Sequence, residues 1–253
     1  MKIVRVDTEV DDITYGAVEA EGIRLHRGTP LVAWEPTETV VAWNQARLLA
    51  PVIPTKIVAV GRNYVDHAVE MDAKVPDEPI IFLKPPTTIV GPMQPIRLPS
   101  DSAEVEHEAE LAIVMGKVTK DVYIEDVGPH ILGYTAANDV TARDLQRRDR
   151  QWTRAKGFDT FCPLGPAIDT ELDPLEGLSI MCRVNGEIRQ SGSTSDMVFG
   201  VGELVAYVSR IMTLLPGDVI LTGTPSGVGP IEAGDRVEVE VEGVGVLMSP
   251  VVG

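Results

Sequence analysis

The sequence contains few cysteines, few aromatic residues and no long hydrophobic run. Its 253 residues include two cysteines, Cys162 and Cys182, which are too few for a disulfide framework or a zinc site. We expect both to be small buried hydrophobic side chains. Aromatic residues make up 5% of the chain, so the core must come mainly from aliphatic side chains. The longest uncharged run, residues 219–231, is shorter than the roughly 18 residues needed to span a bilayer.

Positive charge is also scarce. The chain has 22 Lys and Arg against 38 Asp and Glu, a formal net charge of −16. A field of this sign repels phosphate backbones and anionic lipid headgroups, so we expect no nucleic-acid and no membrane partner. An acidic substrate would need a cation or a few basic residues to reverse the sign locally. Charged residues begin at Lys2 and Arg5, too early for a signal peptide, and we expect a cytoplasmic protein.

Several common enzyme motifs are missing. The sequence has no Gly-x-Gly-x-x-Gly, no Gly-rich loop ending in Gly-Lys-Ser/Thr, no Gly-x-Ser-x-Gly and no His-Glu-x-x-His. Nicotinamide dehydrogenases, P-loop nucleotide hydrolases, α/β-hydrolases and zincin proteases therefore lose their main support.

The residues that are present indicate a β-rich α+β fold. Strand-like segments near the start predict a small N-terminal β domain over residues 1–50. From residue 56 onward, short apolar segments alternate with Gly and Pro, which is typical of many short strands in a larger domain over residues 56–253. The expected strands are residues 2–6, 15–19, 23–26, 56–60, 80–83, 111–115, 178–184 and 219–221.

Two segments have helical patterns. Residues 141–150 begin with Thr141 as an N-cap and have Asp144 three residues later, where a carboxylate favours a helix N-terminus. Residues 201–215 carry an apolar stripe with a period of 3.6 and end before Pro216 and Gly217. We expect this stripe to pack in the core.

The most informative segment carries four alternating glutamates, Glu104, Glu106, Glu108 and Glu110. In a strand these side chains share one face, and His107 points to the other face and is not a co-ligand. Neighbouring carboxylates lie about 6.6 Å apart and repel by roughly 2.5 kcal/mol, so the face needs water or a cation. We expect Glu104 and Glu106 to be solvated.

Glu108 and Glu110 differ because the chain after them is apolar on both faces and must enter the core. Carboxylates at such a place need a partner or a metal. Asp139, which follows an apolar strand, is available as a third oxygen ligand, although alone it would be a turn or capping residue. Ligands that are all oxygen favour Mg²⁺ or Mn²⁺, with Ca²⁺ as an alternative.

Seven short motifs form an ordered series between residues 56 and 245. They are Gly61-Arg62-Asn63-Tyr64 with His67 and Glu70, Phe82-Leu83-Lys84-Pro85, Glu108-Ala109-Glu110-Leu111, Asn138-Asp139-Val140-Thr141-Ala142-Arg143-Asp144, Lys156-Gly157-Phe158-Asp159, Val184-Asn185-Gly186-Glu187 and Thr222-Gly223-Thr224-Pro225. Each motif is weak alone. Their order and spacing resemble the fumarylacetoacetate hydrolase family.

The resemblance implies a mixed β-roll core, usually dimeric, with a divalent metal on the positions of Glu108, Glu110 and Asp139. The homodimer is therefore an expectation. The animal fumarylacetoacetate hydrolases have one more metal-ligating Asp about seven residues before the His, where this chain has Val60-Gly61-Arg62. This difference indicates the smaller branch of acylpyruvate hydrolases, oxaloacetate decarboxylases and 2-hydroxyhepta-2,4-diene-1,7-dioate isomerases.

His67 and Glu70 are three residues apart, so one helical turn would place both on one face, where the carboxylate can orient the imidazole. Such a pair is usually surface decoration, but the resemblance implies a water-activating dyad. It also implies that Lys156 points at the substrate beside the metal, where an ammonium would stabilise enolate charge. Lys84 is expected to support the dyad.

The remaining expected site residues bind substrate. Arg143 and Gln146 lie three apart on one helical face, and the guanidinium of Arg143 offers a planar fork to a carboxylate. The loop at residues 222–229 could present backbone N–H groups or a hydroxyl to an anion, and the family pattern makes Thr224 a substrate-carboxylate contact.

Together these residues indicate an enzyme acting on a small 2-oxo acid or dicarboxylate through a metal-stabilised enolate. We favour C–C bond hydrolysis of an acylpyruvate-like substrate. Decarboxylation of oxaloacetate and isomerisation of 2-hydroxyhepta-2,4-diene-1,7-dioate share the same intermediate and remain open. A non-catalytic protein that binds acidic metabolites would keep Arg143 and Thr224 but would have no use for His67 and Glu70.

Overall fold

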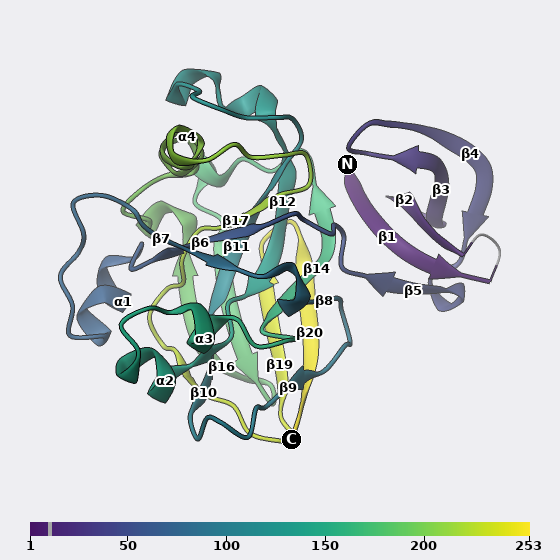
Figure 1. Cartoon of the computed structure of the whole chain (residues 1–253). Helices are drawn as coiled ribbons and strands as arrows, with labels where there is room; N and C mark the ends of the chain where they lie inside the picture. Colours follow the sequence, from purple (N-terminus) through teal and green to yellow (C-terminus); the bar gives the residue numbers. More distant parts are fainter. Residues whose placement is uncertain (10–11) are drawn as a thin grey trace.

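The protein is mostly β-structure, as Figure 1 shows for the computed structural model. The structure describes residues 1–9 and 12–253. Within these residues the largest sheet has twelve strands, and most neighbours in it are antiparallel. Along its main path the strands are β4 (Ala33–Val41), β3 (Gly22–Thr29), β2 (Ile13–Glu19), β1 (Lys2–Thr8), β14 (Cys162–Asp169), β12 (Ile131–Asn138), β11 (Ala109–Met115), β17 (Val219–Leu221), β6 (Ile57–Gly61) and β7 (Ile80–Lys84), with β5 (Ala46–Leu49) on β1 and β8 (Ile89–Val90) on β14.

Two smaller sheets complete the β-structure of the described residues. The strands of the first are β16 (Glu187–Ser193), β15 (Ser179–Val184), β19 (Arg236–Val241), β20 (Gly245–Val252) and β9 (Ile96–Arg97). Those of the second are β13 (Thr141–Ala142), β10 (Val105–His107) and β18 (Gly229–Pro230). The pairs β17–β6, β14–β8 and β20–β9 are parallel, so the fold is mixed as well as β-rich, as the sequence predicts.

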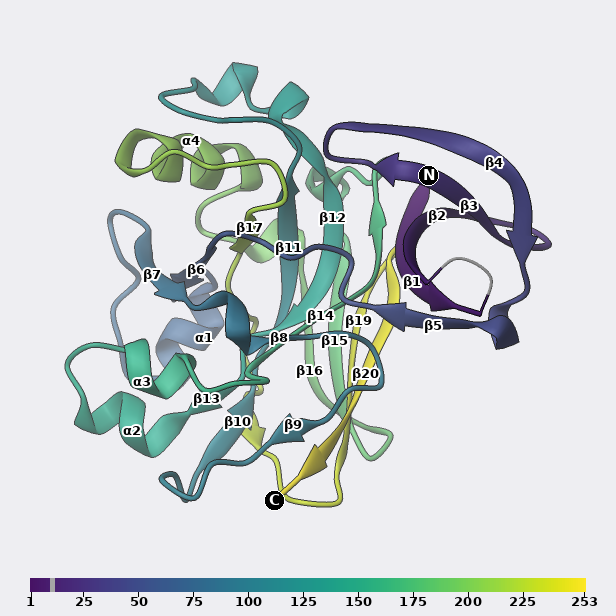
Figure 2. The same ribbon diagram turned by 45° about the vertical axis from the view of Figure 1, so that its right-hand side comes forward.

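The helices are short. The α-helices are α1 (Val65–Glu70), α2 (Arg143–Arg148), α3 (Thr153–Lys156) and α4 (Val201–Ile211), and the 3₁₀ turns are η1 (Trp43–Gln45), η2 (Pro86–Thr88), η3 (Ile124–Asp126), η4 (Gly128–His130), η5 (Pro174–Glu176) and η6 (Thr194–Asp196). Figures 1 and 2 show α1, α2 and α3 gathered on one side of the molecule. Among the described residues, the helices are too short to reach across a bilayer.

The main core lies between the central strands of the large sheet and the five-stranded sheet. β11 and β12 contact β15 and β19 across it. Its side chains are largely aliphatic, as the low aromatic content requires, and include Leu111, Ile113, Val239 and Leu247. Burying such side chains contributes about 1.5–3 kcal/mol each, which makes this layer the principal source of stability.

The N-terminal strands form a lobe at one side of the molecule, visible in both ribbon views. The strands predicted at residues 15–19 and 23–26 are present and form a hairpin, with Glu19 of β2 opposite Gly22 of β3. This lobe has its own small core, to which Val6 and Leu25 belong. It joins the rest of the sheet where Ile3 pairs with Ile168 of β14.

Both predicted helices exist, but each is shorter than predicted. Thr141 is not an N-cap. It lies in β13, where it pairs with Glu106 of β10, and its hydroxyl donates to the Asp139 carbonyl. Asp144 instead accepts hydrogen bonds from Ser102 and Ala103. The helix therefore begins at Arg143 and ends at Arg148.

The second predicted helix, α4, ends at Ile211 rather than at residue 215. The chain leaves the helix because Leu214 forms two backbone hydrogen bonds with Thr119, and a strand-like bridge replaces the last turn. Leu204, Val205 and Val208 of the apolar stripe are buried in the core, as expected.

The two cysteines are free and buried, as the sequence predicts. Cys162 starts β14 and Cys182 lies in β15. Burial raises the pKa of each thiol to about 12. Both behave as small hydrophobic residues of the core.

Candidate active site

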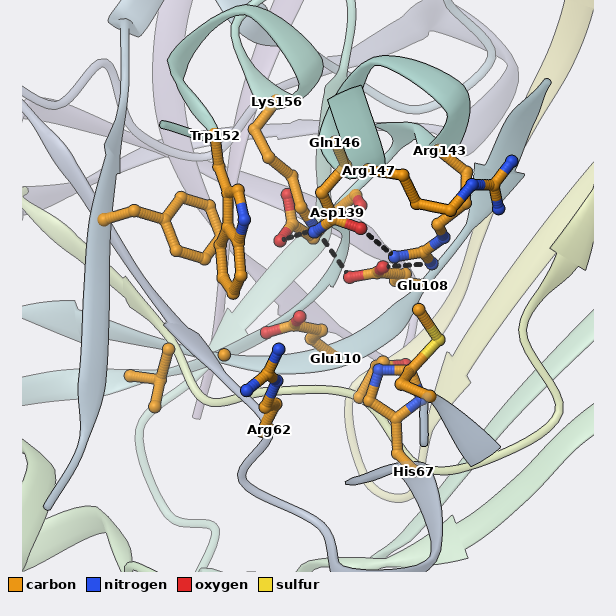
Figure 3. Close-up of a pocket in the computed structure, with 15 residues that line it drawn as sticks. Arg62, His67, Glu108, Glu110, Asp139, Arg143, Gln146, Arg147, Trp152 and Lys156 are labelled. Carbon is orange, nitrogen blue, oxygen red and sulfur yellow. Dashed lines mark hydrogen bonds and ion pairs between the residues drawn. The ribbon is translucent and has the colours of Figure 1, made fainter. Parts of the chain in front are cut away.

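Three buried carboxylates, Glu108, Glu110 and Asp139, lie together at the end of β11 and β12 (Figure 3). Each offers an oxygen, and these ligand atoms lie within 4.8 Å of one another. They line a pocket of about 220 Å³ that also contains His67 and Lys156. The structure thus brings the three predicted metal ligands together in one cavity.

The backbone explains why Glu108 and Asp139 meet. The predicted acidic strand is interrupted at Glu108, between β10 and β11. The Glu108 N–H donates to Asn138 Oδ1 at 2.9 Å, and the Asp139 N–H donates to the Glu108 carbonyl at 2.8 Å. These two bonds join segments thirty residues apart and fix the relative position of the two carboxylates. His107, on the opposite side, is buried with Nδ1 2.9 Å from Gln190 Oε1, so it stays outside the cluster.

The outer glutamates are less alike than expected. Glu104 is 36% exposed in its side chain and pairs with Arg147. Glu106 was expected to be solvated, and that expectation is wrong. Its carboxylate is only 12% exposed and accepts a hydrogen bond from Arg143 Nε at 2.6 Å. A folded-back helix, α2, supplies this partner, and the strand pattern alone gives no sign of it.

Buried cations surround the carboxylate cluster. Lys156 Nζ donates to Glu108 Oε2 at 2.7 Å and to Asp139 Oδ2 at 2.6 Å. Lys84 Nζ donates to Asp139 Oδ1 at 2.5 Å. Arg143 Nη2 donates to Glu108 Oε1 at 2.6 Å. Charged groups buried this deeply need such pairing, because desolvation of an unpaired ion costs several kcal/mol.

The two lysines come from different elements. Lys156 is the last residue of α3, and its side chain is 2% exposed. Lys84, at the end of β7, contacts Asp139 and Val140, whereas its expected partners were His67 and Glu70. The structure therefore places Lys84 against the carboxylate cluster.

The electrostatic balance differs between Glu108 and Glu110. Burial acts to raise the pKa of Glu108, but Lys156 and Arg143 outweigh it and hold that pKa well below its usual range. Burial and the nearby charges of Asp139 and Glu108 raise the pKa of Glu110 well above its usual range. Glu110 accepts one hydrogen bond here, from the Gly223 N–H at 2.6 Å. Within residues 1–9 and 12–253, Glu110 has no ion-pair partner, in contrast to Glu108 and Asp139.

A divalent cation fits this arrangement. The donor set is all oxygen, which suits Mg²⁺ or Mn²⁺ and does not suit a thiophilic metal. The like charges that raise the pKa of Glu110 are those a cation between the carboxylates would compensate. Glu108, Glu110 and Asp139 are the residues that would hold it.

His67 and Glu70 form the predicted pair on α1. His67 Nδ1 lies 3.0 Å from Glu70 Oε2, and Glu70 Oε1 accepts the Gly227 N–H at 3.0 Å. His67 is 5% exposed and lines the pocket. Because Nδ1 is held by Glu70, Nε2 is the ring atom left for chemistry in the pocket.

Arg143 and Gln146 share one face of α2, as their spacing predicts, with Nη1 donating to Gln146 Oε1 at 2.5 Å. All three guanidinium nitrogens of Arg143 donate to protein groups, and its side chain is 3% exposed. Thr224 also lines the pocket, but its hydroxyl donates to the Ala109 carbonyl at 2.8 Å and accepts from Gln190 Nε2 at 2.7 Å. The polar groups expected to bind substrate are thus already engaged with the protein.

Several pocket residues carried no assignment from the sequence. Trp152 and Phe82 form one side, with ring centroids 5.2 Å apart in an edge-to-face pair. Arg62 also lines the pocket and belongs to the first family motif, so a signal was present at that position. Gln190 does not line the pocket, but it supports both His107 and Thr224 and follows the Val184-Asn185-Gly186-Glu187 motif. The aromatic pair has no comparable signal, since it depends on the packing of α3 against β7.

The fold and this pocket define an enzyme with a buried acidic centre and a histidine–carboxylate pair. Residues 56–252 match the fumarylacetoacetate (FAA) hydrolase C-terminal family, and residues 1–51 match an Rv2993c-like N-terminal family. The chain therefore belongs to the fumarylacetoacetate hydrolase family. The fold expected from the resemblance is confirmed by the solved structures of its relatives.

Three relatives illustrate the range of reactions in this family. Human mitochondrial oxaloacetate tautomerase FAHD2B is 49% identical over 84% of this chain and 72% of its own. The crystal structure of 5-carboxymethyl-2-hydroxymuconate delta-isomerase from Mycobacterium smegmatis has a TM-score of 0.93 and 48% identity over 100% of this chain and 99% of its own. Fumarylpyruvate hydrolase from Pseudomonas aeruginosa, in complex with Mn²⁺ and pyruvate, has a TM-score of 0.75 and 35% identity over 81% of this chain and 91% of its own.

Proposed function

We propose that this protein is a divalent-metal-dependent enzyme that enolises a small 2-oxo acid by proton transfer. One observation carries the proposal: the buried imidazole of His67, oriented by Glu70, shares a pocket with three clustered carboxylates. The pocket of about 220 Å³ is smaller than the usual 300–1,000 Å³ of sites for drug-sized ligands, which suits a small metabolite.

Glu108, Glu110 and Asp139 would hold the metal. A bound Mg²⁺ or Mn²⁺ supplies Lewis-acid polarisation of a carbonyl group. The Mn²⁺ and pyruvate in the fumarylpyruvate hydrolase structure support both the metal and the 2-oxo acid. The net charge of −16 makes such local positive charge necessary for binding an anionic substrate.

His67 acts as the general base through Nε2 and takes a proton from the carbon next to the 2-oxo group. Glu70 keeps the imidazole in the tautomer with a protonated Nδ1. Lys156 holds Glu108 and Asp139 in place through its buried ammonium, so the two carboxylates are already positioned when the substrate binds. Return of the proton to a different carbon gives an isomerase, and its return to oxygen gives a tautomerase.

Hydrolysis of an acylpyruvate C–C bond, which the sequence favours, is the second candidate. It would use the same His67 base on water, and the fumarylpyruvate hydrolase at 35% identity supports it. The tautomerase and the isomerase are more similar, at 49% and 48% identity, and this favours proton transfer. Decarboxylation of oxaloacetate needs no base in its bond-breaking step, so it leaves His67 without a role.

The test is a panel of oxaloacetate, acylpyruvates and unsaturated dioic acids, each assayed with Mg²⁺, Mn²⁺ or EDTA. We expect loss of activity on chelation, recovery with Mg²⁺ or Mn²⁺, and enol formation without release of pyruvate or CO₂. Release of pyruvate from an acylpyruvate would establish hydrolysis instead. Full turnover by protein shown to be metal-free would overturn the metal dependence.

A further inference from the structure

Three arginines line the pocket, and they differ in what they already bind. Arg143 donates through all three guanidinium nitrogens to Glu106, Gln146 and Glu108. Arg147 forms an ion pair with Glu104. The guanidinium of the third, Arg62, makes no hydrogen bond or ion pair within residues 1–9 and 12–253. Of these three, Arg62 is the cation that remains available to an anion.

The backbone at Arg62 is held in an unusual conformation. Its φ is 58°, in the left-handed region, which is strained for a residue other than glycine. Such a conformation persists where the surroundings enforce it. On one side, Gly61 lies so close to Trp152 that a Cβ would come within 2.7 Å of the indole ring.

On the other side, Asn63 is fully buried and anchored. Its amide donates to the carbonyls of Thr222 at 2.7 Å and Phe199 at 3.0 Å, and its Oδ1 accepts the Phe199 N–H at 2.8 Å. With both neighbours fixed, the turn at Arg62 is fixed too. Figure 3 shows the result: the Arg62 side chain points into the pocket from the side opposite α2 and α3.

We propose that Arg62 binds the second carboxylate of a 2-oxo dicarboxylate and gives the enzyme its preference for diacids over monoacids. This inference rests on the proposed function. When a diacid places its 2-oxo acid end at the three carboxylates and their metal, its second carboxylate needs a positive partner elsewhere in the pocket. Arg62 lies across the pocket from the paired arginines and offers a planar guanidinium with two parallel donors, which matches a carboxylate.

The experiment compares oxaloacetate with its 4-methyl ester, in which one methyl group removes the distal charge. Their Kd values for the Mn²⁺-loaded protein are measured in the wild type and in Arg62→Asn, because Asn tolerates a left-handed φ. We expect the wild type to prefer the diacid and Arg62→Asn to lose about 10- to 100-fold of that preference, as a charge-assisted bidentate contact requires. Arg62→Lys should retain part of the preference.

The matched control is Arg148→Asn. Arg148 lies in α2 with a side chain that is 64% exposed and is not among the pocket residues, so the variant removes the same charge at a distance. It should leave the ratio of the two Kd values unchanged. Mn²⁺ affinity and the thermal unfolding midpoint of Arg62→Asn should equal those of the wild type, which shows that the site is intact.

Two outcomes separate this inference from the proposed function. If both ligands bind the wild type and Arg62→Asn keeps the same ratio of Kd values, Arg62 does not bind the distal carboxylate and the inference is wrong. If neither ligand binds the Mn²⁺-loaded wild type, the 2-oxo acid site itself is wrong, and the inference falls with it.

Discussion

The wall of the pocket formed by α2, α3 and the end of β12 differs from the wall formed by the loop after β6 and by α1. We call the first the paired wall, with Asp139, Arg143 and Lys156, and the second the open wall, with Arg62 and His67. On the paired wall the charged side chains bind one another or Glu108 over 2.6–2.7 Å. On the open wall the Arg62 guanidinium has no partner in the described chain, and His67 has one ring nitrogen left over.

This difference separates the groups that hold the site from those that act in it. A guanidinium or ammonium that already satisfies two buried carboxylates cannot leave them without exposing uncompensated charge, which is costly in a buried place. Arg143 and Lys156 therefore fix the positions of Glu108 and Asp139 first. Groups with free donors or acceptors lie on the open wall, and new bonds to a substrate form there at lower cost.

The largest effect is expected from the open wall. His67→Ala removes the general base and should lower kcat/KM for the true substrate by about 10²–10⁴. Mn²⁺ affinity, measured by titration, should not change, because His67 is not among the proposed ligands. The control is Asp66→Asn, an exposed residue of the same helix, which should retain full activity. If His67→Ala lost Mn²⁺ affinity as strongly as it lost activity, His67 would be a metal ligand, and the open wall would also hold the metal.

The next effect tests the paired wall through folding. Arg143→Gln leaves Glu106 and Glu108 without their cation and should reduce the free energy of unfolding by about 3–5 kcal/mol in urea titrations. Arg147 lies in the same helix and forms an exposed pair with Glu104. Arg147→Gln should reduce the free energy of unfolding by about 1 kcal/mol or less. If Arg143→Gln raised KM sharply and left stability unchanged, Arg143 would be a substrate clamp, as the sequence suggests, and the paired wall would not be structural.

A smaller effect on stability is expected at Glu110, where substitution should stabilise the metal-free protein rather than destabilise it. Its pKa is raised in the folded protein by burial and by Asp139 and Glu108, so at rising pH the unfolded state loses this proton first and stability falls. Glu110→Gln removes that penalty and keeps an acceptor for the Gly223 N–H. Metal-free Glu110→Gln should therefore have a higher unfolding midpoint than metal-free wild type at pH 7.

The advantage of Glu110→Gln should disappear near pH 4, where Glu110 is largely protonated even in the unfolded chain. Mn²⁺ should stabilise the wild type much more than the variant, because the variant lacks one proposed ligand. The measurement is the thermal unfolding midpoint of wild type and variant at pH 7 and pH 4, each with and without Mn²⁺. A metal-free variant less stable than wild type at pH 7 would show that the cluster is not short of positive charge.

The smallest effect is expected at the two buried cysteines of the core. Burial raises the pKa of Cys162 and of Cys182 to about 12, and a thiol in that state is a poor nucleophile near neutral pH. Native protein should show almost no reaction with a thiol reagent at pH 8, and protein unfolded in guanidinium should show two reactive thiols. Rapid labelling of the native protein would mean that the core around β14 opens.

The sequence predicts the parts of the molecule that depend on local periodicity. The strands at β6, β7, β11, β15 and β17 follow from short apolar segments, and the carboxylate cluster follows from alternating glutamates that run into a buried strand. The pairing of Arg143 with Glu106 depends on where α2 packs and has no local signal. The helix ends also depend on distant partners, since Thr141 joins β10 and Leu214 joins Thr119.

The reciprocal bonds between Glu108 and the Asn138–Asp139 pair have a consequence for how this fold can change over evolutionary time. Because these bonds set the spacing of two proposed ligands directly, the connection between β11 and β12, which carries η3 and η4, does not determine that spacing. Insertions or deletions at the exposed positions of this connection should therefore be inherited without cost to the acidic centre. Replacement of Asn138 by a residue without a side-chain acceptor would instead loosen the centre while leaving every ligand in place.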